Sequence, residues 1–257
     1  MRHLYIKLFV VFTTLLGLAG CRPEPPVLQR LDTGQVRIDS TVQPDDSLVA
    51  FIQPYSDHVN EVLDTPLAYA PELLSKKDGA LNTSLGNLLA DIVLQQADTL
   101  SRRQTGKGAD FALLNHGGLR SIISAGPVTE RTSYEVMPFE NTIYLVSMRG
   151  KAIRDLVSFL AAAEVPHPIA GIQIVLNADG SLRSVNIGGE PFDEDRTYLL
   201  ATSNYLVGGG DGMDFFSQAL EARDTGYRIR NAMTDFFRQT DTLRATVDDR
   251  FIKLSAR

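Results

Sequence analysis

The sequence predicts an α+β fold in which helices pack on mixed β-sheets. Helical and strand patterns interleave along the chain, but hairpin patterns interrupt the alternation that a doubly wound parallel sheet would need. The hydrophobic share, 44% of 257 residues, is enough to build a substantial core. We therefore expect one folded domain over residues 45–257, preceded by a signal segment over 1–20 and a tether over 21–44.

Four elements are expected in the first half of this domain. Residues 44–63 carry apolar residues at helical spacing, and Pro54 should kink or break this helix. Residues 65–74 alternate like an edge strand, residues 83–100 predict a second amphipathic helix, and residues 109–115 predict a short buried strand. In the second helix, the positions expected to face the core are Leu85, Leu88, Leu89, Ile92 and Val93.

The second half mixes helices and strands in the same way. Residues 130–141 predict a short polar helix, residues 141–150 a strand, and residues 151–164 another helix. Residues 171–189 predict a hairpin that turns at an Asp-Gly pair. The remaining expected elements are a strand over 196–206, a glycine-rich loop over 208–216, and a helix over 228–243 capped by Asn231.

The N-terminus predicts export and a lipid anchor. A basic start and an apolar run are followed by small residues, which is the pattern of a secretory signal. The segment "LAGC", residues 18–21, resembles the lipobox of bacterial lipoproteins, in which Cys21 would become lipidated. The alternative is a soluble secreted protein whose single cysteine stands there by accident. We expect a protein anchored in the bacterial cell envelope, at the outer membrane, on its periplasmic or surface face.

Charge and hydropathy exclude two classes of partner or location. The net charge of −6 and the pI near 5.2 argue against a nucleic-acid partner, because such a partner requires a basic face. Beyond the N-terminus, no segment of the sequence is apolar enough to span a bilayer.

The stretch "FALLNHGGLR" ends a buried strand in an unusual turn. Glycine allows positive φ and a close approach of the backbone, and here Gly117 and Gly118 stand together between Asn115 and Arg120. The polar side chains would point from a fixed turn toward whatever approaches it. The stretch is either an elaborate turn or half of a ligand site.

A second strand runs into the glycine-rich stretch "NYLVGGGDG". It lacks the Lys-Ser or Lys-Thr ending of phosphate-binding loops, and its central acid, Asp211, would repel phosphate. A carboxylate instead suits a sugar diol, whose two hydroxyls can both donate to it. Taken alone, Gly209, Gly210 and Asp211 fit a flexible turn equally well.

Two aromatic residues favour the ligand-binding interpretation. Tyr205 stands just before the glycines, and Phe139 follows a proline in the polar "MPFEN" segment. Aromatic faces from separate loops can clamp a planar base, at about 1–3 kcal/mol per stacked base. Together with the polar residues of both turns, they would supply a base clamp, a sugar anchor and an anion partner.

These motifs resemble the C-terminal domain of the 5′-nucleotidases. Five motifs occur in the family's order: "LGNLLAD", "NHGGLR", Gly-x-[Ile/Val]-Thr, "PFEN" and "NYLVGGGDG". The resemblance covers roughly residues 60–240 and implies an α+β domain that binds the nucleoside part of a nucleotide. It implies that Phe139 and Tyr205 stack on the base, that Asp211 binds the sugar, and that Asn115 and Arg120 complete the pocket, with the glycines of both turns beside them.

The sequence departs from the family pattern at three points. Tyr205 stands where a phenylalanine is more usual, and His116 replaces a glycine beside the pocket. An arginine expected just before "LGNL" is missing: Gly79 stands at roughly that place, with Lys76 and Lys77 nearby.

The sequence also lacks the family's catalytic half. The resemblance implies that a separate domain holds two metal ions, whereas His58, His116 and His167 stand far apart in this sequence, without acids at ligand spacing. No Gly-x-Ser-x-Gly elbow is present, and we assign no catalytic residue, metal ligand or cofactor to this chain. Divalent metals are expected in a separate metallophosphatase chain that acts with this one. The alternatives are a stand-alone nucleoside- or nucleotide-binding lipoprotein, and a scaffold whose pocket has lost its function.

Overall fold

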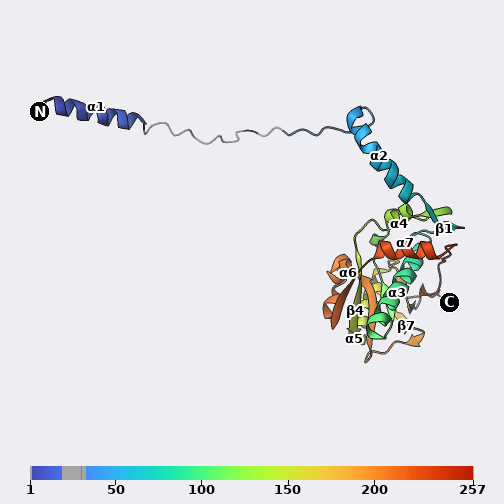
Figure 1. The fold of residues 1–257 in the computed structure, drawn as a ribbon. Helices are drawn as coiled ribbons and strands as arrows, with labels where there is room; N and C mark the ends of the chain where they lie inside the picture. The colour runs from blue at the N-terminus through green and yellow to red at the C-terminus, as the bar shows by residue number, and fades with distance from the viewer. Residues whose placement is uncertain (1, 19–29, 31–32, 257) are drawn as a thin grey trace. The chain divides into compact units, whose positions relative to one another are not determined.

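The computed structural model describes residues 2–18, 30 and 33–256 (Figure 1). The chain divides into two units, Met1–Phe51 and Ile52–Arg257. Within the first unit, the predicted signal segment contains helix α1 (Arg2–Leu18). Cys21 and part of the predicted tether, residues 21–29, 31 and 32, lie outside the described residues. Over the described ranges, no helix is both long and apolar enough to cross a bilayer.

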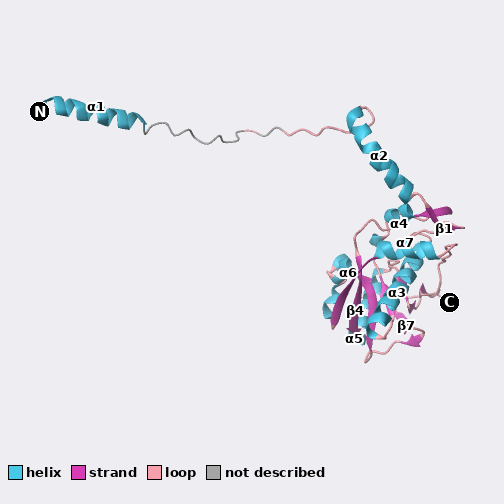
Figure 2. Ribbon diagram, in the orientation of Figure 1, coloured by secondary structure: helices cyan, strands magenta, loops and turns pink. Residues whose placement is uncertain are grey.

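The predicted α+β class is confirmed (Figure 2). The other helices are α2 (Asp46–Leu63), α3 (Ser84–Thr105), α4 (Glu130–Val136), α5 (Gly150–Ala163), α6 (Asn204–Val207) and α7 (Ile229–Gln239), with 3-10 turns η1 (His116–Gly118), η2 (Gly210–Gly212) and η3 (Asp214–Gln218). The strands are β1 (Pro66–Ala70), β2 (Phe111–Leu113), β3 (Gly126–Thr129), β4 (Thr142–Arg149), β5 (Ile169–Ala170), β6 (Ile172–Leu176), β7 (Leu182–Ile187), β8 (Glu190–Pro191), β9 (Thr197–Ser203), β10 (Glu221–Arg228) and β11 (Phe251–Lys253).

The described strands form three sheets, of which the two larger ones are of mixed direction. The central sheet has five strands in the order β10-β4-β9-β2-β5, in which β2 and β9 are parallel and the other neighbours are antiparallel. A second sheet has the order β11-β6-β7-β8 and contains the predicted hairpin. Strand β1 pairs with β3 in a two-stranded sheet, and its Tyr69 also forms an isolated parallel bridge with Thr242.

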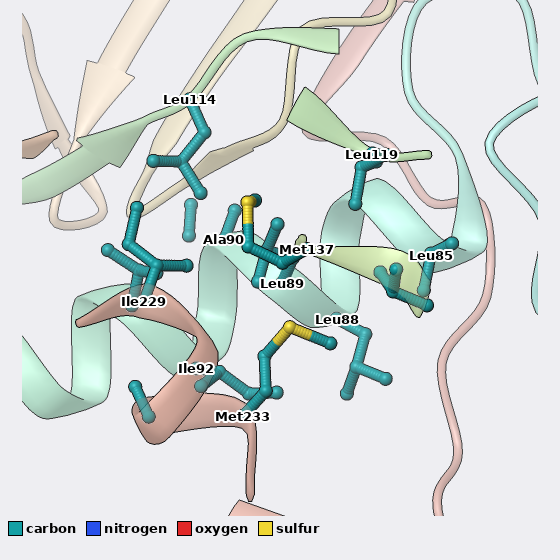
Figure 3. Packing of buried hydrophobic residues seen from close by; sticks show 14 of the residues in the cluster. Leu85, Leu88, Leu89, Ala90, Ile92, Leu114, Leu119, Met137, Ile229 and Met233 are labelled. Carbon is teal, nitrogen blue, oxygen red and sulfur yellow. The ribbon is translucent and has the colours of Figure 1, made fainter. Parts of the chain in front are cut away.

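The central sheet has a hydrophobic core on each face, because side chains alternate along a strand. In β2, Ala112 belongs to one core, whereas Phe111 and Leu113 belong to the other. The first core joins the sheet to α3 and α7, with Leu89 and Met233 among its members (Figure 3). The second core joins it to α5 and to the four-stranded sheet. All five core positions predicted for the second amphipathic helix are buried in α3.

Three local expectations were wrong or incomplete. Helix α2 runs through Pro54 without a break. It has no buried residue, so water can reach the carbonyl group that loses its partner there. Asn231 does not cap α7; Arg228 stands at that position, and the Ile229 N–H donates to the Asn141 carbonyl at 2.9 Å instead. The edge strand β10 was not expected, because its sequence is charged and its side chains are mostly exposed.

Candidate functional site

Three chain segments meet at one end of the central sheet, where β2 and β9 end and β4 begins. Because β2 and β9 are parallel neighbours, the turns that follow them lie at the same end of the sheet. Strand β4 is antiparallel to β9 and pairs Ile143 with Ser203, so the segment before β4 lies at the same end of the sheet. These segments carry Asn115, Phe139 and Tyr205, which are far apart in the sequence.

The turn after β2 holds the side chain of Asn115 in a buried position. Its carbonyl accepts a hydrogen bond from the Gly118 N–H at 3.1 Å, which closes turn η1. A Cβ atom on Gly118 would lie 3.0 Å from the Asn115 Oδ1, and one on Gly117 would lie 3.5 Å from its Nδ2. Gly118 therefore leaves room for the amide of Asn115, whereas a Cβ atom on Gly117 would make only an ordinary van der Waals contact with it.

Arg120 and Phe139 lie together although 19 positions separate them. The guanidinium carbon of Arg120 is 5.9 Å from the centre of the Phe139 ring, within the range of a cation–π contact. The backbone N–H of Arg120 donates to the carbonyl of Val136 at 2.9 Å, which ties this turn to the end of α4. Both side chains are exposed, so both are available to a ligand.

A residue that the sequence did not indicate supports Phe139. The guanidinium of Arg230, on α7, is buried and donates to the carbonyls of Pro138 and Phe139 at 3.3 and 3.4 Å. It also pairs with Glu140, and this pairing lowers the pKa of the Glu140 carboxyl. Arg230 thus fixes the backbone on which Phe139 stands. No sequence signal links the two, because their pairing depends on the tertiary fold.

In the second turn, the ring of Tyr205 packs on the loop and its hydroxyl binds Asp211. The Tyr205 hydroxyl donates to the Asp211 Oδ1 at 2.7 Å, and this hydrogen bond raises the pKa of Tyr205. A Cβ atom on Gly210 would lie 2.5 Å from the Tyr205 Cζ, so only glycine fits beneath the ring. Gly209 and Asp211 have positive φ, +86° and +54°. The aromatic ring and the carboxylate thus belong to one folded unit.

Two histidines that stand far apart in the sequence are neighbours here. The backbone N–H of His116 donates to the His167 Nδ1 at 3.3 Å. Burial lowers the pKa of both imidazoles; the nearby charge of Asp211 opposes this for His167, and that of Lys76 reinforces it for His116. Both rings therefore favour the neutral form near pH 7.

Positive charge gathers beside the first turn. The ammonium group of Lys76 donates to the Leu119 carbonyl, next to Arg120. Burial lowers the pKa of Lys76, and the charges of Arg120 and Lys77 lower it further. A cation therefore lies close to Arg120, although the arginine expected before "LGNL" is absent.

No metal centre is found in the described part of the chain, where no group of three His, Cys, Asp or Glu side chains could hold an ion.

A cavity of about 760 Å³ lies at the opposite end of the central sheet, near the starts of β2 and β9. Its lining includes Arg102, Asp110, Arg196 and Arg223, but none of the predicted site residues.

Comparison with known proteins points to one family. Residues 65–218 match the family model described as "5′-nucleotidase, C-terminal domain". A 5′-nucleotidase of Vibrio vulnificus is 29% identical over 219 residues, which cover 81% of this chain and 37% of the relative. The solved structure of a 5′-nucleotidase precursor from Thermus thermophilus superposes with a TM-score of 0.68 at 25% identity, over 82% of this chain and 43% of that one.

The same fold recurs at lower identity. The NAD nucleotidase of Haemophilus influenzae superposes with a TM-score of 0.61 at 20% identity, over 82% of this chain and 42% of that one. The chain thus spans less than half the length of the relatives that it matches.

Proposed function

Because the chain belongs to the 5′-nucleotidase C-terminal domain family, we propose that it holds the nucleoside part of a nucleotide for phosphate-ester hydrolysis. The base lies between Phe139 and Tyr205, and the ribose hydroxyls donate to Asp211. Asn115 and Arg120 complete the pocket from the turn after β2. The observation that carries this proposal is that these three segments meet at one end of the central sheet.

The chemistry of the side chains fits such a ligand. Aromatic stacking tolerates different bases and contributes about 1–3 kcal/mol per base. A carboxylate accepts several hydrogen bonds, so Asp211 can bind both hydroxyls of a ribose. The positive charges of Arg120 and Lys76, brought together beside the first turn, favour an anionic 5′-phosphate on that side.

We assign hydrolysis to a partner, a separate metallophosphatase chain that holds the divalent metals. The match to the family's C-terminal domain supports this assignment, because the resemblance implies that another domain holds the metal ions, and no metal-ligand group is found among the described residues. Helix α2 offers a surface for such a partner, because Ile52, Val59 and Val62 are each at least half exposed. The chain then contributes substrate orientation, which lowers the barrier by removing positional entropy.

The proposal includes a location in the cell envelope. A signal segment over residues 1–20 directs export, and a lipid on Cys21 anchors the chain. The tether over residues 21–44, rich in proline and polar residues, then holds the domain away from the membrane.

Calorimetry with millimolar adenosine and AMP tests this function, with and without a metallophosphatase chain encoded beside this one. We expect binding of both ligands, no AMP hydrolysis by the isolated chain with Mn²⁺, and metal-dependent hydrolysis by the mixture. Equal binding in both conditions without hydrolysis by the mixture would favour the stand-alone binding lipoprotein. Absence of binding in both conditions would refute the pocket.

A further inference from the structure

The Tyr205–Asp211 hydrogen bond has a role that stacking alone does not require. A phenylalanine would offer a base the same face, but only tyrosine has a hydroxyl that reaches the Asp211 carboxylate. Among the described residues, the Asp211 carboxylate accepts a hydrogen bond from one other side chain: the Tyr205 hydroxyl donates to its Oδ1 at 2.7 Å.

The loop around Asp211 does not fix the direction of its side chain. Asp211 is exposed and has a φ of +54°, between Gly209 at +86° and Gly212 at +71°. Glycine neighbours restrict the backbone little, and an exposed carboxylate has no packing to hold its rotamer. Without the tyrosine hydroxyl, this carboxylate would sample several orientations.

The ring of Tyr205 is itself held in place. Its inner face rests on Gly210, where any side chain would collide with it, and the residue remains 44% exposed. A base can therefore stack on the exposed face while the hydroxyl keeps its bond to Asp211. The hydrogen bond thus joins the stacking face and the carboxylate into one preformed unit.

The carboxylate keeps enough acceptor capacity for a sugar. Its two oxygens offer about four lone-pair sites, and the tyrosine hydroxyl uses one of them on Oδ1. Two ribose hydroxyls can then donate to the remaining sites. A ligand without these hydroxyls gains nothing from the orientation of the carboxylate.

We propose that the Tyr205 hydroxyl is a positioning group that orients Asp211 and thereby sets the preference of the pocket for ribose over sugars lacking the 2′- and 3′-hydroxyls. The inference rests on the proposed function of this site. The Tyr205 hydroxyl contributes to ligand binding through Asp211, by fixing the direction of its carboxylate.

The test compares adenosine with 2′,3′-dideoxyadenosine by calorimetry in the wild type and in Tyr205→Phe. The substitution keeps the ring, so affinity for the dideoxy compound should stay unchanged. Affinity for adenosine should fall about threefold to tenfold, which is comparable to the net contribution of one ordinary hydrogen bond. In an Asp211→Ala background, Tyr205→Phe should change neither affinity. Tyr69→Phe, in the two-stranded sheet and 51% exposed, is the matched control and should change nothing.

The outcomes separate this inference from the proposed function. If the wild type prefers adenosine and Tyr205→Phe keeps that preference, the positioning role is refuted while the pocket stands. A gain in adenosine affinity would also refute it, because the hydroxyl would then compete with the sugar. If the wild type binds neither nucleoside, both proposals fail.

Discussion

Replacing Arg230 by methionine should destabilise the domain by about 3 kcal/mol. Its guanidinium donates to the carbonyls of Pro138 and Phe139 at 3.3 and 3.4 Å and lies 4.2 Å from the centre of the Tyr134 ring. Hydrogen bonds from a charged donor contribute about 1.5–3 kcal/mol, and since these two are long we assign about 1 kcal/mol to each. The cation–π contact adds about 1 kcal/mol. Methionine retains the apolar stem, so little packing is lost.

Urea unfolding and calorimetric melting measure this loss. For a domain of this size, each kcal/mol corresponds to about 2–4 °C, so the melting temperature should fall by about 6–12 °C. Arg228→Gln is the matched control, because Arg228 pairs with the same Glu140 at 2.8 Å but its side chain is 52% exposed. Exposed ion pairs contribute little, so this control should melt close to the wild type.

Binding provides the second readout. If Arg230 holds Phe139 in place, Arg230→Met should weaken the binding of adenosine and 2′,3′-dideoxyadenosine by similar factors, because the contact proposed for Phe139 is with the base and not with the sugar. Equal melting of the two arginine variants would contradict the assigned support. A large loss of stability with intact affinity would show that the site does not depend on the Phe139 segment.

Three further predictions concern the sugar contact, pH and the anchor. Asp211→Ala should weaken adenosine by about 1–3 kcal/mol and 2′,3′-dideoxyadenosine far less; equal losses in calorimetry would remove Asp211 from the sugar contact. Because burial holds the pKa of His167 below its usual value, the folded state favours the neutral ring: its stabilisation is complete above about pH 6.5 and is lost as the pH falls toward the folded pKa. His167→Asn keeps an acceptor for the His116 N–H, so its urea midpoint should drop less than that of the wild type between pH 7.5 and 5.5; an equal drop would contradict this. Cys21→Ser should release the protein from membranes in fractionation, and unchanged partitioning would rule out the lipid anchor.

The sequence carried enough information to predict elements whose residues pack locally. Helix α3 was predictable because its apolar residues recur at helical spacing and face one core. The turns after β2 and β9 were predictable because glycines next to polar residues at a strand end have few structural uses. Strand β10 was not, because it pairs with β4 at a sheet edge, where side chains face water and leave no apolar pattern.

The candidate site divides in the same way. Asn115, Phe139 and Asp211 could be nominated from their own neighbourhoods, because each has a chemistry that its local motif displays. Their supports could not, since Arg230 lies 91 positions beyond Phe139 and His167 lies 51 beyond His116. The pairing of β2 with β9 and β5 and the packing of α7 bring these groups together.

Transferring the motif residues to another scaffold would therefore not rebuild the site. The Tyr205–Asp211 hydrogen bond spans only six positions, yet it forms because Asp211 adopts positive φ and Gly210 leaves room for the ring. The position of Phe139 depends on a buried guanidinium from another helix. The residue types supply the chemistry of recognition, whereas the end of the central sheet and α7 supply its geometry. A graft that carries Asn115, Phe139 and Asp211 without these supports should lose the discrimination between ribose and dideoxyribose before it loses stacking, because a carboxylate contact depends more on orientation than an aromatic face does.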